Sequence, residues 1–252
     1  HHRQHRSHAM TLVLLLSLAA FITSSITAAT GIGGGVVLLA LMAQLVPPAI
    51  LIPLHGAAQL MSNTNRVLVQ RKFINWAYIK PFLVGSVVGG ALITPLALYM
   101  PVPVGQVLLG LFIVLATWKS AWLRLAHWPP AASGGITTGL SLVLGATGPL
   151  VMSVLPKSSW ERQVVVGTHG MAMVIQHGIK VIAFSSLNVS LVEYWPLLLG
   201  IGLATLAGNL MGARLLTRVP EEKFTLILNW LLTALALRLV YQGISALLTA
   251  GN

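Results

Sequence analysis

The chain has 252 residues, of which 56% are hydrophobic and only 8% are charged, and its mean hydropathy is +0.86. A soluble domain carries about 25% charged residues, so this composition excludes an ordinary water-soluble globular enzyme. Fifteen Lys and Arg residues stand against four Glu, with no Asp and no Cys, which excludes disulfides, thiolate metal sites and cysteine nucleophiles. The cations separate long apolar runs, a pattern typical of an integral membrane protein rather than of a nucleic-acid-binding protein.

The first nine residues differ in composition from the rest of the chain. They are rich in His and Arg and precede Met10, so we interpret residues 1–9 as a tag or a disordered N-terminus. Residues 10–252 are then expected to form a single transmembrane domain.

Apolar segments follow one another along the whole of that domain. They are predicted at 11–46, 48–66, 77–100, 103–124, 133–156, 163–184, 191–213 and 222–248. Glycine clusters interrupt the first segment at 31–35 and the fifth at 145–149. Such breaks are tolerated at membrane depth only where the backbone is buried in protein or lines a cavity.

The two interrupted segments belong to an internal repeat. Matching residues lie 114 positions apart in four pairs, which are Gly31 and Gly145, Gly34 and Gly148, His55 and His169, and Arg66 and Lys180. A constant offset needs no gap, so we predict two related halves at about 11–126 and 133–248.

The loop charges predict how the halves are oriented. The loop after 48–66 is basic and the loop at 99–103 carries no charge, whereas the equivalent loops of the second half show the reverse. By the positive-inside rule this favours inverted repeats, each with a Gly-broken re-entrant hairpin and three transmembrane helices. The alternative is eight full spans in two parallel halves.

The glycine clusters are candidate binding elements. Backbone without side chains can approach a ligand closely, and the N-terminus of the following helix presents free N–H groups to an anion. The candidate residues of the two clusters are Gly31, Gly33, Gly34, Gly35, Gly145 and Gly148, flanked by Thr30 and Thr147. The alternatives are close packing of helices through small residues and, for the two threonines, hydrogen bonds to freed backbone groups.

A polar stripe follows each glycine cluster. His55, Gln59, Asn63 and Arg66 share one helical face, and the second half presents His169, Gln176, His177 and Lys180. Ionisable residues in apolar spans are costly to insert and usually face a cavity or a partner, which favours a substrate site. The alternatives are interhelical hydrogen bonds for the histidines, a topology signal for Arg66, and a Lys180 that snorkels to the interface.

The chain resembles the TauE/SafE family of membrane transporters, also called the toluene-sulfonate uptake permease family. The likeness runs from Met10 over nearly the whole length and is carried by the glycine motif at Gly31, Gly33, Gly34 and Gly35. The second copy departs from the motif, with Thr147 and Pro149 beside its glycines. The resemblance implies export or uptake of sulfite, sulfonates or related organic anions across the cytoplasmic membrane.

The sequence therefore predicts a secondary active transporter of a small oxyanion, sulfite or an organosulfonate, in a bacterial cytoplasmic membrane. His55 and His169 are expected to hydrogen-bond the anion and to carry a coupling proton, because histidine has an ordinary pKa of about 6.5. An anion channel and, less readily, an intramembrane enzyme are the alternatives. We find no catalytic motif and expect no catalytic residue, metal, cofactor or nucleic acid, with the anion, protons and the lipid bilayer as partners.

Overall fold

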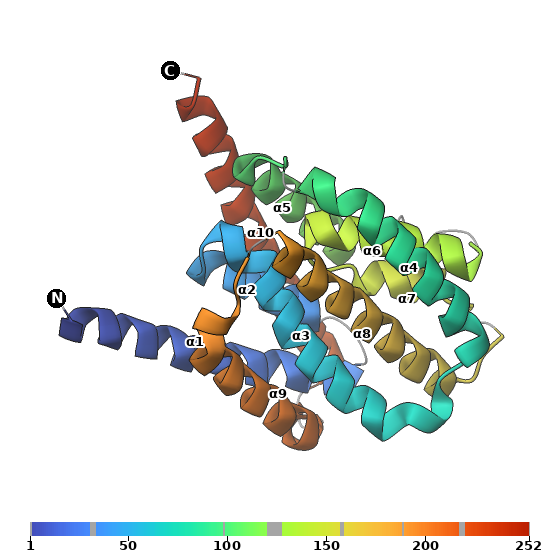
Figure 1. The fold of residues 1–252 in the computed structure, drawn as a ribbon. Coiled ribbons are helices and arrows are strands. Elements are labelled where there is room, and N and C mark those ends of the chain that lie inside the picture. The colour runs from blue at the N-terminus through green and yellow to red at the C-terminus, as the bar shows by residue number, and fades with distance from the viewer. Residues whose placement is uncertain are drawn as a thin grey trace.

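The protein is built from helices. The computed structural model describes residues 2–30, 34–97, 99–119, 128–156, 159–187, 189–216 and 220–251, and all regular structure in these ranges is helical (Figure 1). The first half holds α1 (His2–Thr30), α2 (Gly34–Leu45), α3 (Pro48–Gln70), η1 (Arg71–Phe73), α4 (Trp76–Ala97) and α5 (Val102–Trp118). The second half holds α6 (Pro130–Leu144), α7 (Gly148–Val154), α8 (Arg162–Ser186), η3 (Val192–Tyr194), α9 (Trp195–Leu216) and α10 (Glu221–Thr249). The expected all-helical class is confirmed.

Proline and glycine set several helix boundaries. Pro48 and Pro130 stand in the first turns of α3 and α6, where the missing N–H of proline costs no helical hydrogen bond. Gly145 ends α6 with a φ of 90°, a conformation that side-chain-bearing residues rarely adopt. The break in the second half therefore follows directly from one glycine.

The N-terminal residues belong to α1. The helix begins at His2, so residues 2–9 are helical and not disordered. Their interpretation as a tag stays a prediction. The break between α1 and α2 covers residues 31–33 and lies outside the described residues.

Equivalent helices of the two halves pack against each other in antiparallel pairs. In the pair of α3 and α8, Gly56 faces Lys180 whereas Val67 faces Gly170, so residue numbers rise along one helix as they fall along the other. The pair of α5 and α10 behaves likewise. Figure 1 shows α3 and α8 running side by side through the middle of the molecule.

Two further pairs join non-equivalent helices of the two halves. α1 packs on α9 and α4 packs on α6, in both cases with parallel chains: Gly200 lies against Ser17, and Gly85 lies against Ala131. In the repeat, α1 is equivalent to α6 and α4 is equivalent to α9. If each helix is replaced by its equivalent, the α1–α9 pair becomes the α6–α4 pair, while α3–α8 and α5–α10 remain the same pairs. This is the packing expected when a twofold axis crosses the helices at right angles.

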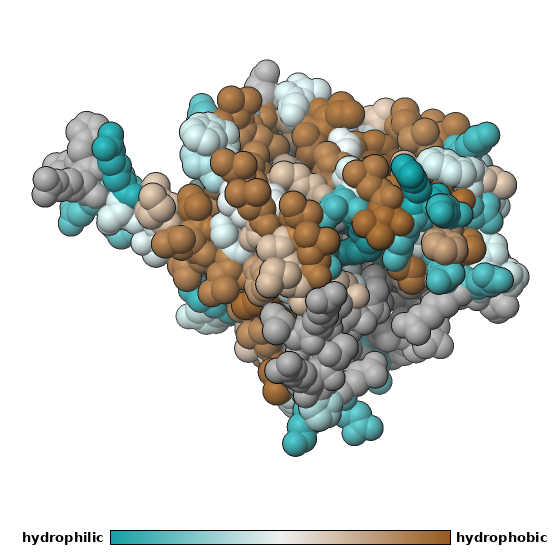
Figure 2. All heavy atoms as spheres, turned by 90° about the horizontal axis from the view of Figure 1, so that it is seen from below, coloured by the Kyte–Doolittle hydropathy of each residue, from teal (hydrophilic) through white to brown (hydrophobic). Residues whose placement is uncertain are grey.

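The outer surface suits a lipid environment. Four described helical stretches are long and apolar enough to cross a membrane, namely Gln4–Ala28, Trp76–Ala97, Val192–Met211 and Asn229–Thr249. Large apolar side chains such as Val84, Leu92 and Leu203 are more than half exposed, and hydrophobic residues cover much of the face in Figure 2. The protein is a polytopic membrane protein, because a soluble protein rarely exposes so much contiguous apolar surface.

Candidate functional site at the two helix breaks

Helix α8 holds the break between α6 and α7 at several points. Lys180 is fully buried, and its Nζ donates a hydrogen bond to the carbonyl oxygen of Gly145, at the C-terminal end of α6. Thr147 donates to Oε1 of Gln176 (2.8 Å), and Nε2 of Gln176 donates to Oγ1 of Thr137 on α6 (2.6 Å). Lys180 therefore does not snorkel to the interface, the alternative considered for it from the sequence. Its cation instead lies where the dipole of α6 is negative.

The first half shows part of the same arrangement. Nε2 of His55 on α3 lies 2.8 Å from the carbonyl oxygen of Gly35, in the first turn of α2. The Gln59 amide also lies beside that turn, because a Cβ added to Gly35 would stand 3.1 Å from its Oε1. The backbone N–H of Gly34 donates to Oγ1 of Thr27 (3.1 Å). A buried helix start thus contacts two polar side chains of the predicted stripe.

The two repeat-related histidines make the same kind of contact. Nε2 of His169 lies 2.9 Å from the carbonyl oxygen of Gly148, as Nε2 of His55 does from Gly35. A carbonyl oxygen only accepts, so in each ring Nε2 must carry the hydrogen and donate it. The interhelical hydrogen bond considered for these histidines is therefore present. It occupies one nitrogen of each ring.

A third histidine, His177, contacts one of these two rings. His177 on α8 meets His55 on α3 edge to face, with ring centroids 5.8 Å apart. Both rings are buried, and in each the Nδ1 atom has no hydrogen-bond partner in the structure. Lys180 follows His177 by one helical turn, and its side chain packs on Gly56, the residue after His55. Three basic groups from two helices thus share one buried region.

The acidic residues belong to other parts of the chain. Glu161 is the N-cap of α8, Glu193 belongs to η3, and Glu221 and Glu222 begin α10, which accounts for every acid in the sequence. Within the described ranges, no group of three His, Cys, Asp or Glu residues is arranged to hold a metal ion. The buried region therefore has basic and neutral polar groups that suit an anion.

The remaining predicted residues are only partly brought together. Asn63 is buried and its side chain donates to the backbone of Gln59, while Arg66 donates to Oδ1 of Asn63 (3.3 Å), away from the histidines along α3. Gly31 and Gly33, and the side chain of Thr30, lie outside the described residues. Thr137 was not predicted, although it contacts Gln176 directly. A hydroxyl on a helix commonly bonds its own backbone, as Thr137 also does, and this hides its second contact from sequence reasoning.

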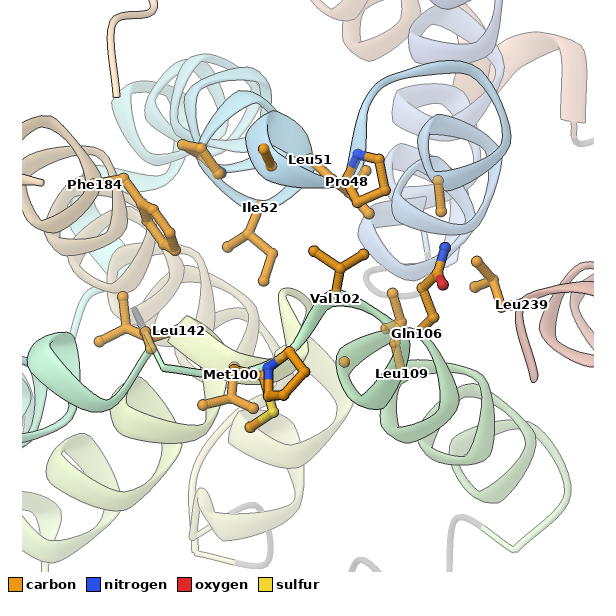
Figure 3. Close-up of a pocket in the computed structure, with 17 residues that line it drawn as sticks. Pro48, Leu51, Ile52, Met100, Val102, Gln106, Leu109, Leu142, Phe184 and Leu239 are labelled. Atoms are coloured by element: carbon orange, nitrogen blue, oxygen red, sulfur yellow. The ribbon is translucent and has the colours of Figure 1, made fainter. Parts of the chain in front are cut away.

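A small apolar cavity lies next to the break of the second half. Its volume is about 160 Å³, and it is lined from both halves by residues that include Pro48, Ile52, Met100, Leu142 and Phe184 (Figure 3). Gln106 is the exception in an otherwise apolar lining. Ile52 also covers Gly145, since a Cβ added there would meet Ile52 at 3.5 Å and Leu39 at 2.8 Å. Ile52 thus lies between the cavity and Gly145.

Comparison with known proteins identifies the family. Residues 16–239 match the family described as "Sulfite exporter TauE/SafE", and this range includes both helix breaks and all three buried histidines. Neither the comparison with curated proteins nor that with solved structures gave a match. Since the matched range covers most of the sequence, the chain belongs to the TauE/SafE sulfite exporter family of membrane transporters.

Proposed function

We propose that the protein is a secondary active transporter of a small oxyanion, sulfite or an organosulfonate, across the cytoplasmic membrane. The family supplies the general activity, which is transport of sulfite or a related anion through the membrane. The choice of oxyanion, the active mechanism and the residues below are our proposal.

The observation that carries the proposal is a buried cation without a buried acid. Lys180 is fully enclosed, its recorded partner is the uncharged Gly145 carbonyl, and the four Glu residues stand at helix ends. A buried charge is costly unless it is paired. A bound oxyanion would provide the missing negative charge, so the site is better suited to an anion than to a cation.

The histidines are proposed to bind the anion in their protonated form. Because Nε2 of His55 donates to Gly35, a neutral ring presents only the lone pair of Nδ1, which repels an oxyanion. A proton on Nδ1 converts this atom into a donor. His169 makes the equivalent contact with Gly148 in the second half.

The cavity offers a route to the site. It lies at the start of α3 and the end of α8, and Ile52 lies both in its lining and beside Gly145. We infer that the anion passes this cavity and that displacement of Ile52 opens the site. Alternating access would then consist of opening one helix break while the other remains covered.

The experiment that tests the proposal is transport in proteoliposomes. Uptake of labelled sulfite is compared with that of sulfoacetate, thiosulfate and sulfate, with and without unlabelled sulfite inside the vesicles. Stimulation by internal sulfite is expected of a carrier, whereas flux that only follows the electrochemical gradient would indicate an anion channel. Binding of a cation in preference to every anion tested would overturn the proposal.

A further inference from the structure

The two histidines that meet at the centre are not repeat mates. The repeat pairs His55 with His169, and it pairs His177 with Asn63. Yet the His55 ring contacts the His177 ring, at 5.8 Å between centroids and with the planes at 74°. The antiparallel packing of α3 on α8 creates this pair, because it places Gly56 opposite the backbone of His177 and the side chain of Lys180.

The ionisable groups placed beside this pair in the described structure are basic. Lys180 lies one turn after His177 on α8 and packs on Gly56, the neighbour of His55, while His169 lies about two turns before His177 on the same helix. A proton added to either ring would place a second positive charge beside a protonated Lys180. With no carboxylate nearby to balance it, that charge is strongly opposed in a low-dielectric interior unless an anion enters.

The two unpartnered histidine nitrogen atoms indicate where the anion would bind. Nδ1 of His55 and Nδ1 of His177 are both buried and without a partner. Unpaired buried polar atoms are rare, and they usually mark a bound water, an ion or a functional site. An added proton makes Nδ1 of His55 a donor, and neutral His177 can carry its own hydrogen on Nδ1, so both atoms can donate to one oxyanion. A proton or an oxyanion alone would leave an unbalanced charge.

We propose that the His55–His177 pair takes up one proton with each anion that binds, so that proton and anion cross the membrane together. This inference rests on the proposed transport function and names the residues of its coupling. Because linkage is reciprocal, the anion strengthens proton binding by the factor by which the proton strengthens anion binding. A dianion such as sulfite would then move with a net charge of −1, and an interior-negative membrane potential would favour its export.

Calorimetry of the purified full-length protein tests the coupling without transport. Binding of sulfoacetate is measured in two buffers of different ionisation enthalpy, which gives the number of protons taken up for each anion bound. The sulfonate group and the carboxylate group, whose ordinary pKa is about 4, are both ionised at neutral pH. A parallel titration with methanesulfonate, which has no carboxylate, shows whether the proton is taken up by the protein. We expect about one proton in the wild-type protein, and an affinity that weakens about tenfold for each unit of rising pH above the pKa of the pair.

The decisive variant is His177→Asn, which introduces the residue found at the equivalent position of the first half, Asn63. We expect its proton uptake to fall well below that of the wild type, while His8→Asn on the exposed start of α1 keeps the wild-type value. Zero uptake in the wild type, or unchanged uptake in both His177→Asn and His177→Gln, would overturn the inference.

Two further outcomes separate this inference from the proposed function. If both variants at position 177 lose binding, the pH dependence of wild-type affinity decides, and a pH-independent affinity contradicts the coupling. If the wild-type protein moves the anion without proton uptake, the coupling alone fails. If it neither binds nor moves sulfite or sulfoacetate, the proposed function itself is wrong.

Discussion

The positive charge of Lys180 is predicted to contribute to anion binding. Lys180→Met keeps the length of the side chain and removes its charge. A hydrogen bond to a charged group contributes about 1.5–3 kcal/mol, so anion affinity should fall by about 10- to 100-fold. The measurement is the dissociation constant of sulfite or sulfoacetate, with size-exclusion elution as the test of folding.

The matched control for this charge removal is Lys80→Met. Lys80 is exposed on α4 and is not one of the proposed site residues on α3 and α8. The Lys80→Met protein should bind the anion with the affinity of the wild type. An unchanged affinity in Lys180→Met would show that the buried cation serves only to hold the end of α6.

The hydroxyl of Thr147 is predicted to stabilise the second helix break. Thr147→Val keeps the shape of the side chain but leaves Oε1 of Gln176 without the donor that lies 2.8 Å away. Interhelical hydrogen bonds in membrane proteins are modest, so we expect a loss of about 1 kcal/mol in the free energy of unfolding. Thermal unfolding in detergent measures the effect against Thr249→Val, an exposed residue of α10. Equal unfolding temperatures in the two variants would argue against this role.

At the scale of helices, α4 and α6 approach through glycine. A Cβ added to Gly89 would lie 2.2 Å from the carbonyl oxygen of Gly135, a distance that backbone atoms can relieve only by moving apart. Gly89→Ala is therefore expected to lower the free energy of unfolding by about 1–3 kcal/mol, although alanine has the higher helix propensity. Thermal unfolding measures it.

The control for Gly89 has the opposite expected sign. A Cβ added to Gly105 on α5 would meet its nearest neighbour, Met100, at an ordinary 3.8 Å. Gly105→Ala should therefore leave stability unchanged or raise it by up to about 1 kcal/mol. If both alanine variants shift the unfolding temperature in the same direction, close helix approach is not what Gly89 provides.

Helix positions were predictable from the sequence because charge and proline interrupt hydrophobicity at the helix ends. The predicted segment 48–66 continues in the structure to Gln70, so of the basic residues in this region only Arg71 and Lys72 lie beyond α3. The contact of His55 with Gly35 was not predictable in its detail. The repeat predicted that His55 and the glycine cluster belong to one site. Which nitrogen of the His55 ring stays free depends on the carbonyl that the ring meets, and the sequence does not show this.

The pairing of His55 with His177 shows where sequence reasoning ends. The constant offset of the repeat links His55 to His169, and nothing in either half specifies how far α3 and α8 slide along each other. That register is set by contacts between the halves, such as Gly56 on Lys180 and Gly170 on Val67. A repeat predicts which helices are equivalent, whereas side-chain packing decides which residues meet.

At the scale of the whole molecule, the antiparallel pairing of equivalent helices favours inverted repeats. Residues that follow α3 and precede α10 would then face the cytoplasm, while the turns after α4 and before α9 would face the opposite side. In the alternative with eight spans in parallel halves, the turn before α9 would face the cytoplasm and the residues before α10 would face the opposite side. The length of α1, which includes a stretch able to cross a membrane, does not by itself separate the two arrangements.

Because the chain contains no cysteine, single introduced cysteines can report the topology against no background. We expect Lys72→Cys and Glu222→Cys to react with a membrane-impermeant maleimide only after the cells are permeabilised. Tyr99→Cys and Val192→Cys, both highly exposed in the structure, should react in intact cells. Labelling that places position 72 with position 192, and position 99 with position 222, would instead establish parallel halves. The two helix breaks would then open toward the same side of the membrane, which is incompatible with alternating access through them.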